Sequence, residues 1–137
     1  MASIAQVRQA LSDAVDSIEG LRCRPYVPDN VSTPQAVIAD DGVDYDLVLG
    51  RGADTYRYKI VVYVDRDAEI AAQKLLDTLR EPVGSTSMKT VVEANAALAA
   101  LVDYAQVKRA SEIQAASTTD ASQAEYLMIE FDVEIVY

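Results

Sequence analysis

Hydrophobic residues at the start of the chain recur at the spacing of an amphipathic helix. From Ile4 to Ile18 they stand three or four residues apart, and the positions between them are mostly polar. Ser3 precedes the run as a candidate N-cap, and Gly20 follows it as a stop signal. The pattern predicts a helix over 4–18 that lies on a sheet with its other side in water.

Two later segments show the two-residue period of β-strands. Residues 55–65 are rich in β-branched and aromatic side chains, and apolar residues alternate with mostly polar ones from Leu127 to Tyr137. Both faces of 55–65 become apolar toward its end, which predicts a central strand or one that touches a partner. The final strand must be paired, because an unpaired edge of this regularity would promote aggregation.

Shorter patterns lie on either side of the first of these strands. The runs 21–27 and 34–39 predict two short extended segments, and the prolines around the first indicate a sheet edge. After the long strand, Asp67 is a candidate N-cap for a helix that ends near Arg80. Its apolar positions, including Ile70, are expected to face the core.

The second half of the chain is less regular. A third helix is predicted from Met88 to about Asn95, and the alanine-rich stretch that follows either prolongs it or turns away at Asn95. A strand over 104–115 and an exposed loop over 116–124 then lead into the final strand.

This order of elements is typical of an α+β domain. We predict a mixed or largely antiparallel sheet of about four main strands, with two to three helices packed on one face. With no linker or internal repeat, the chain is expected to form one domain over 1–137. Its start lacks the pattern of a signal peptide, and no apolar run reaches the ~20 residues of a membrane span, so a soluble protein with no membrane contact is expected.

Composition argues against most catalytic and metal sites. The chain has no histidine and one cysteine, Cys23, so the usual zinc ligands and the usual general base are missing. Arg22 and Arg24 flank Cys23 and would favour its thiolate, but without a base a small core or strand residue is the favoured interpretation. No glycine-rich nucleotide loop or nucleophile motif occurs, so neither an enzyme nor a cofactor is expected.

The sequence features closest to a catalytic or metal site are two groups of carboxylates. Glu130, Asp132 and Glu134 alternate along the last strand, where they imitate a catalytic pair but are better explained as its solvated side. The second group lies among glycines in an order that does not match a calcium loop, and a solvated hairpin loop is the favoured interpretation. This acidic group consists of Asp40, Asp41, Asp44 and Asp46.

Charge and aromatic content point toward assembly. With 22 acidic and 12 basic residues the net charge is −10, which repels a phosphate backbone and disfavours nucleic-acid binding. Eight of the nine aromatic residues are tyrosines, which suit contacts that are half apolar and half wet. Tyr56, Arg57, Tyr58 and Lys59 are therefore a candidate interface, although a central strand of an isolated monomer would carry the same pattern.

The segments described above, taken together, resemble a known family, the tail terminator proteins of long-tailed, siphovirus-type bacteriophages, especially those that infect actinobacteria. The resemblance covers nearly the full chain and consists of order and spacing rather than a catalytic signature. The segments that carry it are Ile4 to Ile18, Arg24-Pro25-Tyr26-Val27-Pro28, Pro34-Gln35-Ala36-Val37-Ile38, Tyr56 to Val64 entering Asp65-Arg66, Leu79-Arg80-Glu81-Pro82, Gly84-Ser85-Thr86-Ser87-Met88 and Glu130-Phe131-Asp132-Val133-Glu134.

The resemblance implies a structural subunit that requires no chemistry. Such a subunit forms a homohexameric ring on the end of the tail tube, stops tube polymerisation and presents the surface for head-tail joining. Its implied partners are further copies of itself, the major tail tube protein and the head-tail connector or head-closure proteins. Viral DNA passes through without specific binding, and the protein, made in the host bacterial cytoplasm, is expected in the tail or neck of the virion. The acidic group is a candidate for a loop in the lumen of such a ring.

Three other functions are compatible with the same sequence. One is another neck protein, such as a tail-completion or head-closure protein. A second, of a different class, is a small-molecule-binding α+β domain, which would need a deep apolar pocket. The weakest is an enzyme built on Glu130 and Asp132.

Overall fold

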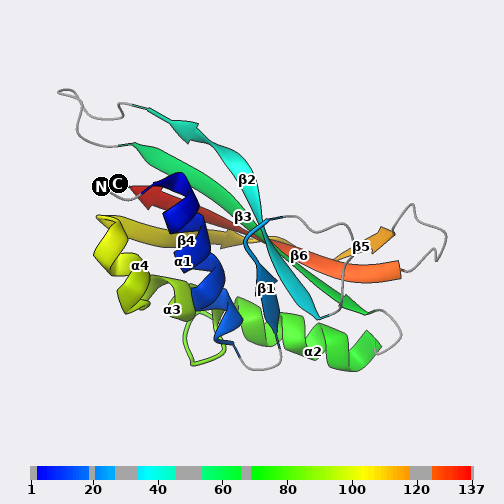
Figure 1. Ribbon diagram of the computed structural model, residues 1–137. Coiled ribbons are helices and arrows are strands. Elements are labelled where there is room, and N and C mark those ends of the chain that lie inside the picture. Colours follow the sequence, from blue (N-terminus) through cyan, green and yellow to red (C-terminus); the bar gives the residue numbers. More distant parts are fainter. Residues whose placement is uncertain are drawn as a thin grey trace.

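The computed structural model describes residues 3–18, 21–26, 34–45, 54–65, 69–117 and 125–136, and it has the predicted α+β architecture (Figure 1). Helices and strands are mixed along the chain rather than strictly alternating. In order, the elements are α1 (Ile4–Asp16), β1 (Arg22–Arg24), β2 (Gln35–Asp44), β3 (Thr55–Asp65), α2 (Glu69–Arg80), α3 (Met88–Glu93), α4 (Ala96–Leu101), β4 (Tyr104–Ala110), β5 (Gln114–Ser117) and β6 (Glu125–Val136).

The strands form one mixed sheet in the order β1-β2-β3-β6-β4. β1 pairs with β2 in parallel, and the remaining pairings are antiparallel. β4 and β5 pair with successive stretches of β6, so β5 continues the position that β4 occupies. The last described strand, β6, is paired, as predicted, and it has partners on both sides. The edge position of β1 was also predicted.

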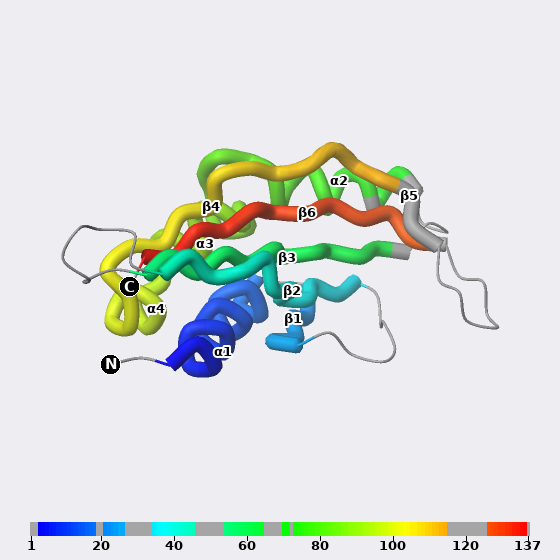
Figure 2. Tube along the Cα trace, turned by 90° about the horizontal axis from the view of Figure 1, so that it is seen from above, coloured from blue at the N-terminus to red at the C-terminus, as the bar shows by residue number. Residues whose placement is uncertain are grey.

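The described helices pack against the same face of the sheet, as predicted, although there are four of them rather than two to three. Figure 2 shows α1 on the side of β1 and β2, and α2 on the side of β4. Buried residues of every helix join one core cluster with alternate residues of β3 and β6. The strand residues of this cluster are Tyr56, Tyr58, Ile60, Val62, Val64, Leu127, Ile129, Phe131, Val133 and Ile135.

The first helix begins where the sequence predicts. The Ser3 hydroxyl accepts a hydrogen bond from the Gln6 backbone N–H at 3.1 Å, and the Gln6 side chain accepts one from the Ser3 N–H at 2.8 Å. This reciprocal pair satisfies two backbone donors that the first turn leaves without partners. The predicted stop signal, Gly20, lies outside the described residues.

The orientation predicted for Ile70 is wrong. Its side chain is 73% exposed, whereas Leu76 and Leu79 of the same helix are fully buried. At about 100° per residue, Ile70 lies roughly half a turn around α2 from Leu79, so the two cannot face the same core. The predicted N-cap, Asp67, lies outside the described residues.

The alanine-rich stretch turns away at Asn95 instead of prolonging α3. The Asn95 backbone is extended, and its side-chain oxygen accepts a hydrogen bond from the Leu98 N–H at 2.9 Å, so it caps the separate helix α4. The strand predicted over 104–115 is likewise two strands, β4 and β5. Residues 116 and 117 belong to β5 rather than to the predicted loop, and the rest of that loop lies outside the described residues.

Candidate interaction surface

The face of the sheet opposite the helices, here called the open face, carries the most distinctive surface of the described part of the chain. It follows from strand alternation, because residues next to the core positions of each strand point the other way. Its central side chains are Arg57, Lys59, Val61 and Tyr63 of β3 and Met128, Glu130, Asp132 and Glu134 of β6, with Lys108 and Arg109 of β4 beside them.

One half of the open face is a charged ladder. The acidic row of β6 lies between the basic residues of β3 and those of β4, with Asp132 opposite both Lys59 and Arg109. Lys59 contacts Glu130 at 3.7 Å, and Lys108 contacts Glu134 at 2.8 Å. Each carboxylate therefore has at least one cation on a neighbouring strand, so the row takes part in cross-strand charge pairing.

The other half of the open face is apolar and aromatic. Val37 of β2 and Val61 of β3 are paired neighbours and are only 3% and 7% exposed. Tyr63 meets Tyr126 edge to face, with ring centroids 6.1 Å apart. Partial burial, with a smaller contribution from the nearby Glu130 carboxylate, raises the pKa of Tyr63.

The candidate interface on β3 divides between the two faces. Tyr56 and Tyr58 are 7% and 2% exposed and point into the core, so the prediction that their rings form a contact surface is wrong. Arg57 and Lys59 lie on the open face.

The reason is that helix α1 covers the tyrosine side of β3. The Arg8 guanidinium lies 5.5 Å from the Tyr58 ring centroid and 4.6 Å from that of Tyr26. The Tyr58 hydroxyl donates to the Ile4 carbonyl at 3.5 Å, and burial raises the pKa of Tyr58 although Arg8 opposes the shift. Tyrosine thus serves here as a core residue with its hydroxyl at the rim.

The acidic group does not form a loop in its described part. Asp40, Asp41 and Asp44 belong to β2, and Asp46 lies outside the described residues. The strand is irregular between Asp40 and Val43, where Gly42 adopts a positive φ of 102° and donates its N–H to the Asp40 carboxylate at 2.8 Å.

The irregularity separates the carboxylates instead of gathering them. Asp40 pairs with Tyr58, a core position, whereas Asp44 lies opposite Thr55 and binds Arg57 at 2.7 Å. Among the residues that the structure describes, no group of three or more potential metal ligands is found.

The cysteine is a packing residue. Cys23 lies at the edge strand β1, its N–H donates to the Asp16 carboxylate at 3.0 Å, and its thiol packs near Ser12. Burial raises the thiol pKa to about 11, with Asp16 and Asp13 adding to the shift and the Ser12 hydrogen bond opposing it. A thiol with this pKa is a poor nucleophile at neutral pH.

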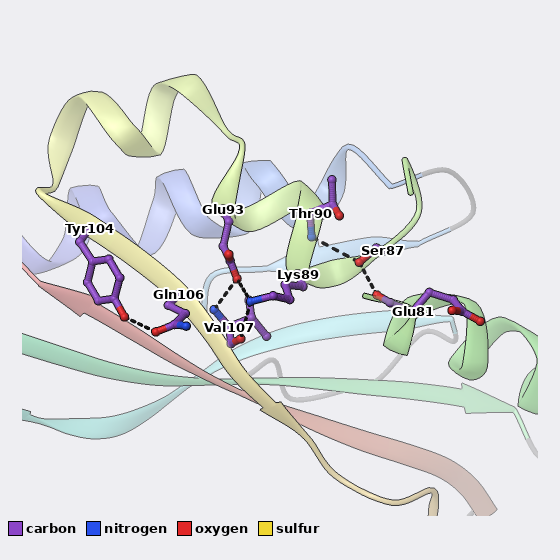
Figure 3. A network of polar contacts seen from close by, with 8 residues as sticks. All are labelled: Glu81, Ser87, Lys89, Thr90, Glu93, Tyr104, Gln106 and Val107. Carbon is purple, nitrogen blue, oxygen red and sulfur yellow. Dashed lines mark hydrogen bonds and ion pairs between the residues drawn. The ribbon is translucent and has the colours of Figure 1, made fainter. Parts of the chain in front are cut away.

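A hollow of about 240 Å³ lies between α3, α4 and the start of β4. Its apolar lining comes chiefly from Val92, Leu98 and Val102, and its rim includes the Glu93 carboxylate. This volume is below the roughly 300 Å³ at which pockets for drug-sized ligands begin. Glu93 is also already engaged by Lys89 and by the Val107 backbone (Figure 3).

Comparison with known protein-family models gives no match for this chain, and comparison with curated proteins gives no significant match. No helix within the described ranges combines the length and apolar character that crossing a membrane requires.

Proposed function

We propose that this protein is a structural virion subunit that caps the tail tube of a long-tailed bacteriophage as a homo-oligomeric ring. In this role it ends tube polymerisation and offers the surface to which the head attaches. The observation that carries the proposal is a sheet with all its helices on one face and a charged and aromatic open face on the other. This surface agrees with the assembly role that the resemblance implies.

The open face combines the two properties that an assembly contact needs. In its apolar half Val37 and Val61 are already buried within the subunit, so the half-buried rings of Tyr63 and Tyr126 supply the aromatic surface there, of the kind enriched in interfaces. Its charged half supplies a patterned set of cations and anions, which favours one register of contact over others. Arg57 and Lys59 belong to this half and are the residues that we assign to the contact.

The chemistry of the described residues favours assembly over catalysis or small-molecule binding. The Cys23 thiol is protonated at neutral pH, and the carboxylates of β6 are paired with cations. The hollow beside α4 is small, and the Glu93 carboxylate that lines it binds Lys89. A larger depression of about 470 Å³ is lined mostly by charged residues, Asp77, Arg80 and Glu81, and is not an apolar pocket. A net charge of −10 also suits a ring through which DNA must move without adhering.

Deletion of the gene from the phage genome tests the proposal directly. Electron microscopy of the resulting particles should show tails of uncontrolled, excessive length without heads, and the gene supplied in trans should restore normal virions. Normal virions from the deletion would refute the proposal. Tails of correct length that remain separate from heads would instead identify the protein as another neck or tail-completion component.

A complementary test uses purified components. The protein added to polymerising tail tube subunits should stop elongation and appear as a ring at one tube end. A protein that stays monomeric and leaves the tube length unchanged would contradict the proposal.

A further inference from the structure

Side chains of a helix meet one edge of the sheet. Within the described residues β4 pairs with β6 alone, and side chains of α3 bind the backbone at its other edge. An open strand edge presents unpaired backbone N–H and C=O groups, which form a template for pairing with another chain. The structure shows what these groups contact at Val107, in the middle of β4.

Both backbone groups of Val107 are taken by one pair of side chains from α3 (Figure 3). The Val107 N–H donates to the Glu93 carboxylate at 3.2 Å, and the Lys89 ammonium donates to the Val107 carbonyl at 3.4 Å. Lys89 and Glu93 also bind each other at 2.5 Å. Their spacing of four residues places them on the same side of the helix, so the pair meets the edge as a unit. This arrangement is called the edge clasp below.

The clasp reproduces the hydrogen bonds of an absent strand. A neighbouring strand would accept from one N–H and donate to one C=O of the same residue, which is what Glu93 and Lys89 do. Both side chains are partly shielded from water, at 30% and 42% exposed. A charge-assisted hydrogen bond in such a setting is stronger than one between neutral groups.

Other features at the two edges of the sheet also disfavour pairing with a further strand. The register of β4 shifts between Val107 and Arg109, which places a bulge in this edge strand. At the opposite edge, β1 has only three residues and is followed directly by Pro25. Bulges, lysines, prolines and short strands are the features by which proteins prevent pairing between sheet edges.

We propose that the Lys89–Glu93 clasp is an assembly guard that prevents β4 from pairing with a strand of a second copy of this chain. Self-association is thereby restricted to other surfaces. This inference stands independently of the phage role, since it concerns the edge of the sheet and not the open face.

The test compares Glu93→Ala with Glu112→Ala as a matched control. Both substitutions remove one negative charge, but Glu112 is exposed and lies outside the clasp. In sedimentation velocity at increasing concentration, Glu93→Ala should form species larger than those of the wild type, whereas the control should match the wild type. At low concentration, hydrogen exchange of the Val107 amide should become about tenfold faster in Glu93→Ala, because that N–H loses its acceptor.

A second substitution shows whether the new species form through β4. Val107→Pro removes the outward N–H, so the double variant Glu93→Ala/Val107→Pro should return to the wild-type assembly state. Lys89→Met keeps the aliphatic stem but removes the donor to the Val107 carbonyl, and it provides the same test if Glu93→Ala does not fold. The proposal is overturned if the folded clasp variant keeps the wild-type assembly state, or if the double variant associates as strongly as the single one.

Discussion

At the scale of single residues, the local environment reverses what sequence neighbours suggest. Two arginines flank Cys23 and would favour its thiolate, yet in the structure burial dominates and the nearest charges are the carboxylates of Asp13 and Asp16. Both influences disfavour the thiolate, so the pKa rises instead of falling. Adjacent residues in a strand point to opposite sides, which is why sequence proximity is a poor guide to the field at a side chain.

The shift at Cys23 predicts slow thiol chemistry. The thiol pKa rises from 9.0 to about 11, so at pH 8 the thiolate fraction should fall by about a hundredfold compared with the unfolded chain. Reaction with an aromatic disulfide reagent, followed by absorbance, should therefore be about a hundredfold slower in native protein than in urea. Equal rates in the two states would show that the thiol is neither buried nor perturbed.

The caps of the helices give a second prediction at this scale. The buried Ser87 hydroxyl donates to the Glu81 carbonyl at 2.5 Å and accepts from the Thr90 N–H at 3.3 Å (Figure 3). Ser87→Ala leaves both groups without this partner and should lower the free energy of unfolding by about 1–3 kcal/mol. Urea denaturation followed by circular dichroism measures the loss.

Ser3→Ala is the control for this prediction. Ser3 also caps a helix, but at an exposed position where water replaces the lost contact. Its loss should stay at or below about 1 kcal/mol. A loss for Ser87→Ala no larger than that for Ser3→Ala would contradict the role given to burial.

At the scale of elements, β6 shows how one strand serves two surfaces. Ile129 is fully buried under the helices, whereas its neighbour Met128 lies on the open face. Ile129→Ala should lower the free energy of unfolding by about 2–5 kcal/mol, because it leaves a cavity in the core. Met128→Ala should cost much less in the isolated subunit.

Chemical denaturation of both variants measures the difference between the two faces of β6. If Met128 contributes to assembly, its substitution should weaken self-association while leaving the stability of the subunit nearly unchanged. Equal losses of stability from the two substitutions would mean that the open face is covered within the subunit.

The long elements could be predicted from the sequence because each one carries its whole periodic pattern within its own residues. The helix α1 and the strands β3 and β6 each show a sustained period, and Ser3 supplies a cap that depends only on its own neighbours. The α+β class and the placement of helices on one face followed from their order.

The predictions that were wrong or missing concern residues whose burial or contacts depend on a different helix or strand. The face of β3 that carries Tyr56 and Tyr58 is apolar along its length, which suits a core and a contact surface equally, so only the helices packed on that face decide that the two tyrosines are buried. The edge clasp could not be anticipated either, because its partner is the backbone of Val107, which lies 14 residues beyond Glu93. The sequence pattern of apolar and polar side chains does not show which backbone groups lie at a free strand edge.

At the scale of the whole molecule, the residues that stabilise the fold and the residues assigned to contacts between molecules lie on opposite faces of the sheet. The helices and one sheet face form the single core cluster, while the other sheet face carries paired charges and tyrosines. Surface ion pairs of this kind contribute at most about 1 kcal/mol each to folding. Changes on the open face should therefore alter contacts between molecules more than they alter the fold.

Reversal of one charge on the open face tests this separation together with the proposed function. Lys59→Glu places a carboxylate opposite Asp132 and near Glu130, where like charges repel. We expect the variant to fold with a loss of about 1 kcal/mol or less, but to lose self-association and the ability to stop elongation of tail tubes. Lys74→Glu makes the same change of net charge on the exposed side of α2 and should behave as the wild type.

The comparison of these two variants separates the contact surface from total charge. If both variants lose the ability to stop tube elongation, the acidic excess itself limits assembly. Raising the salt concentration should then restore both variants, because salt screens charge. If only Lys59→Glu loses activity, the defect lies on the open face and in the pairing of β3 with β6. If neither variant is affected, assembly must use another surface. Because the edge clasp already engages the middle of β4, the search would turn to the outer sides of the helices.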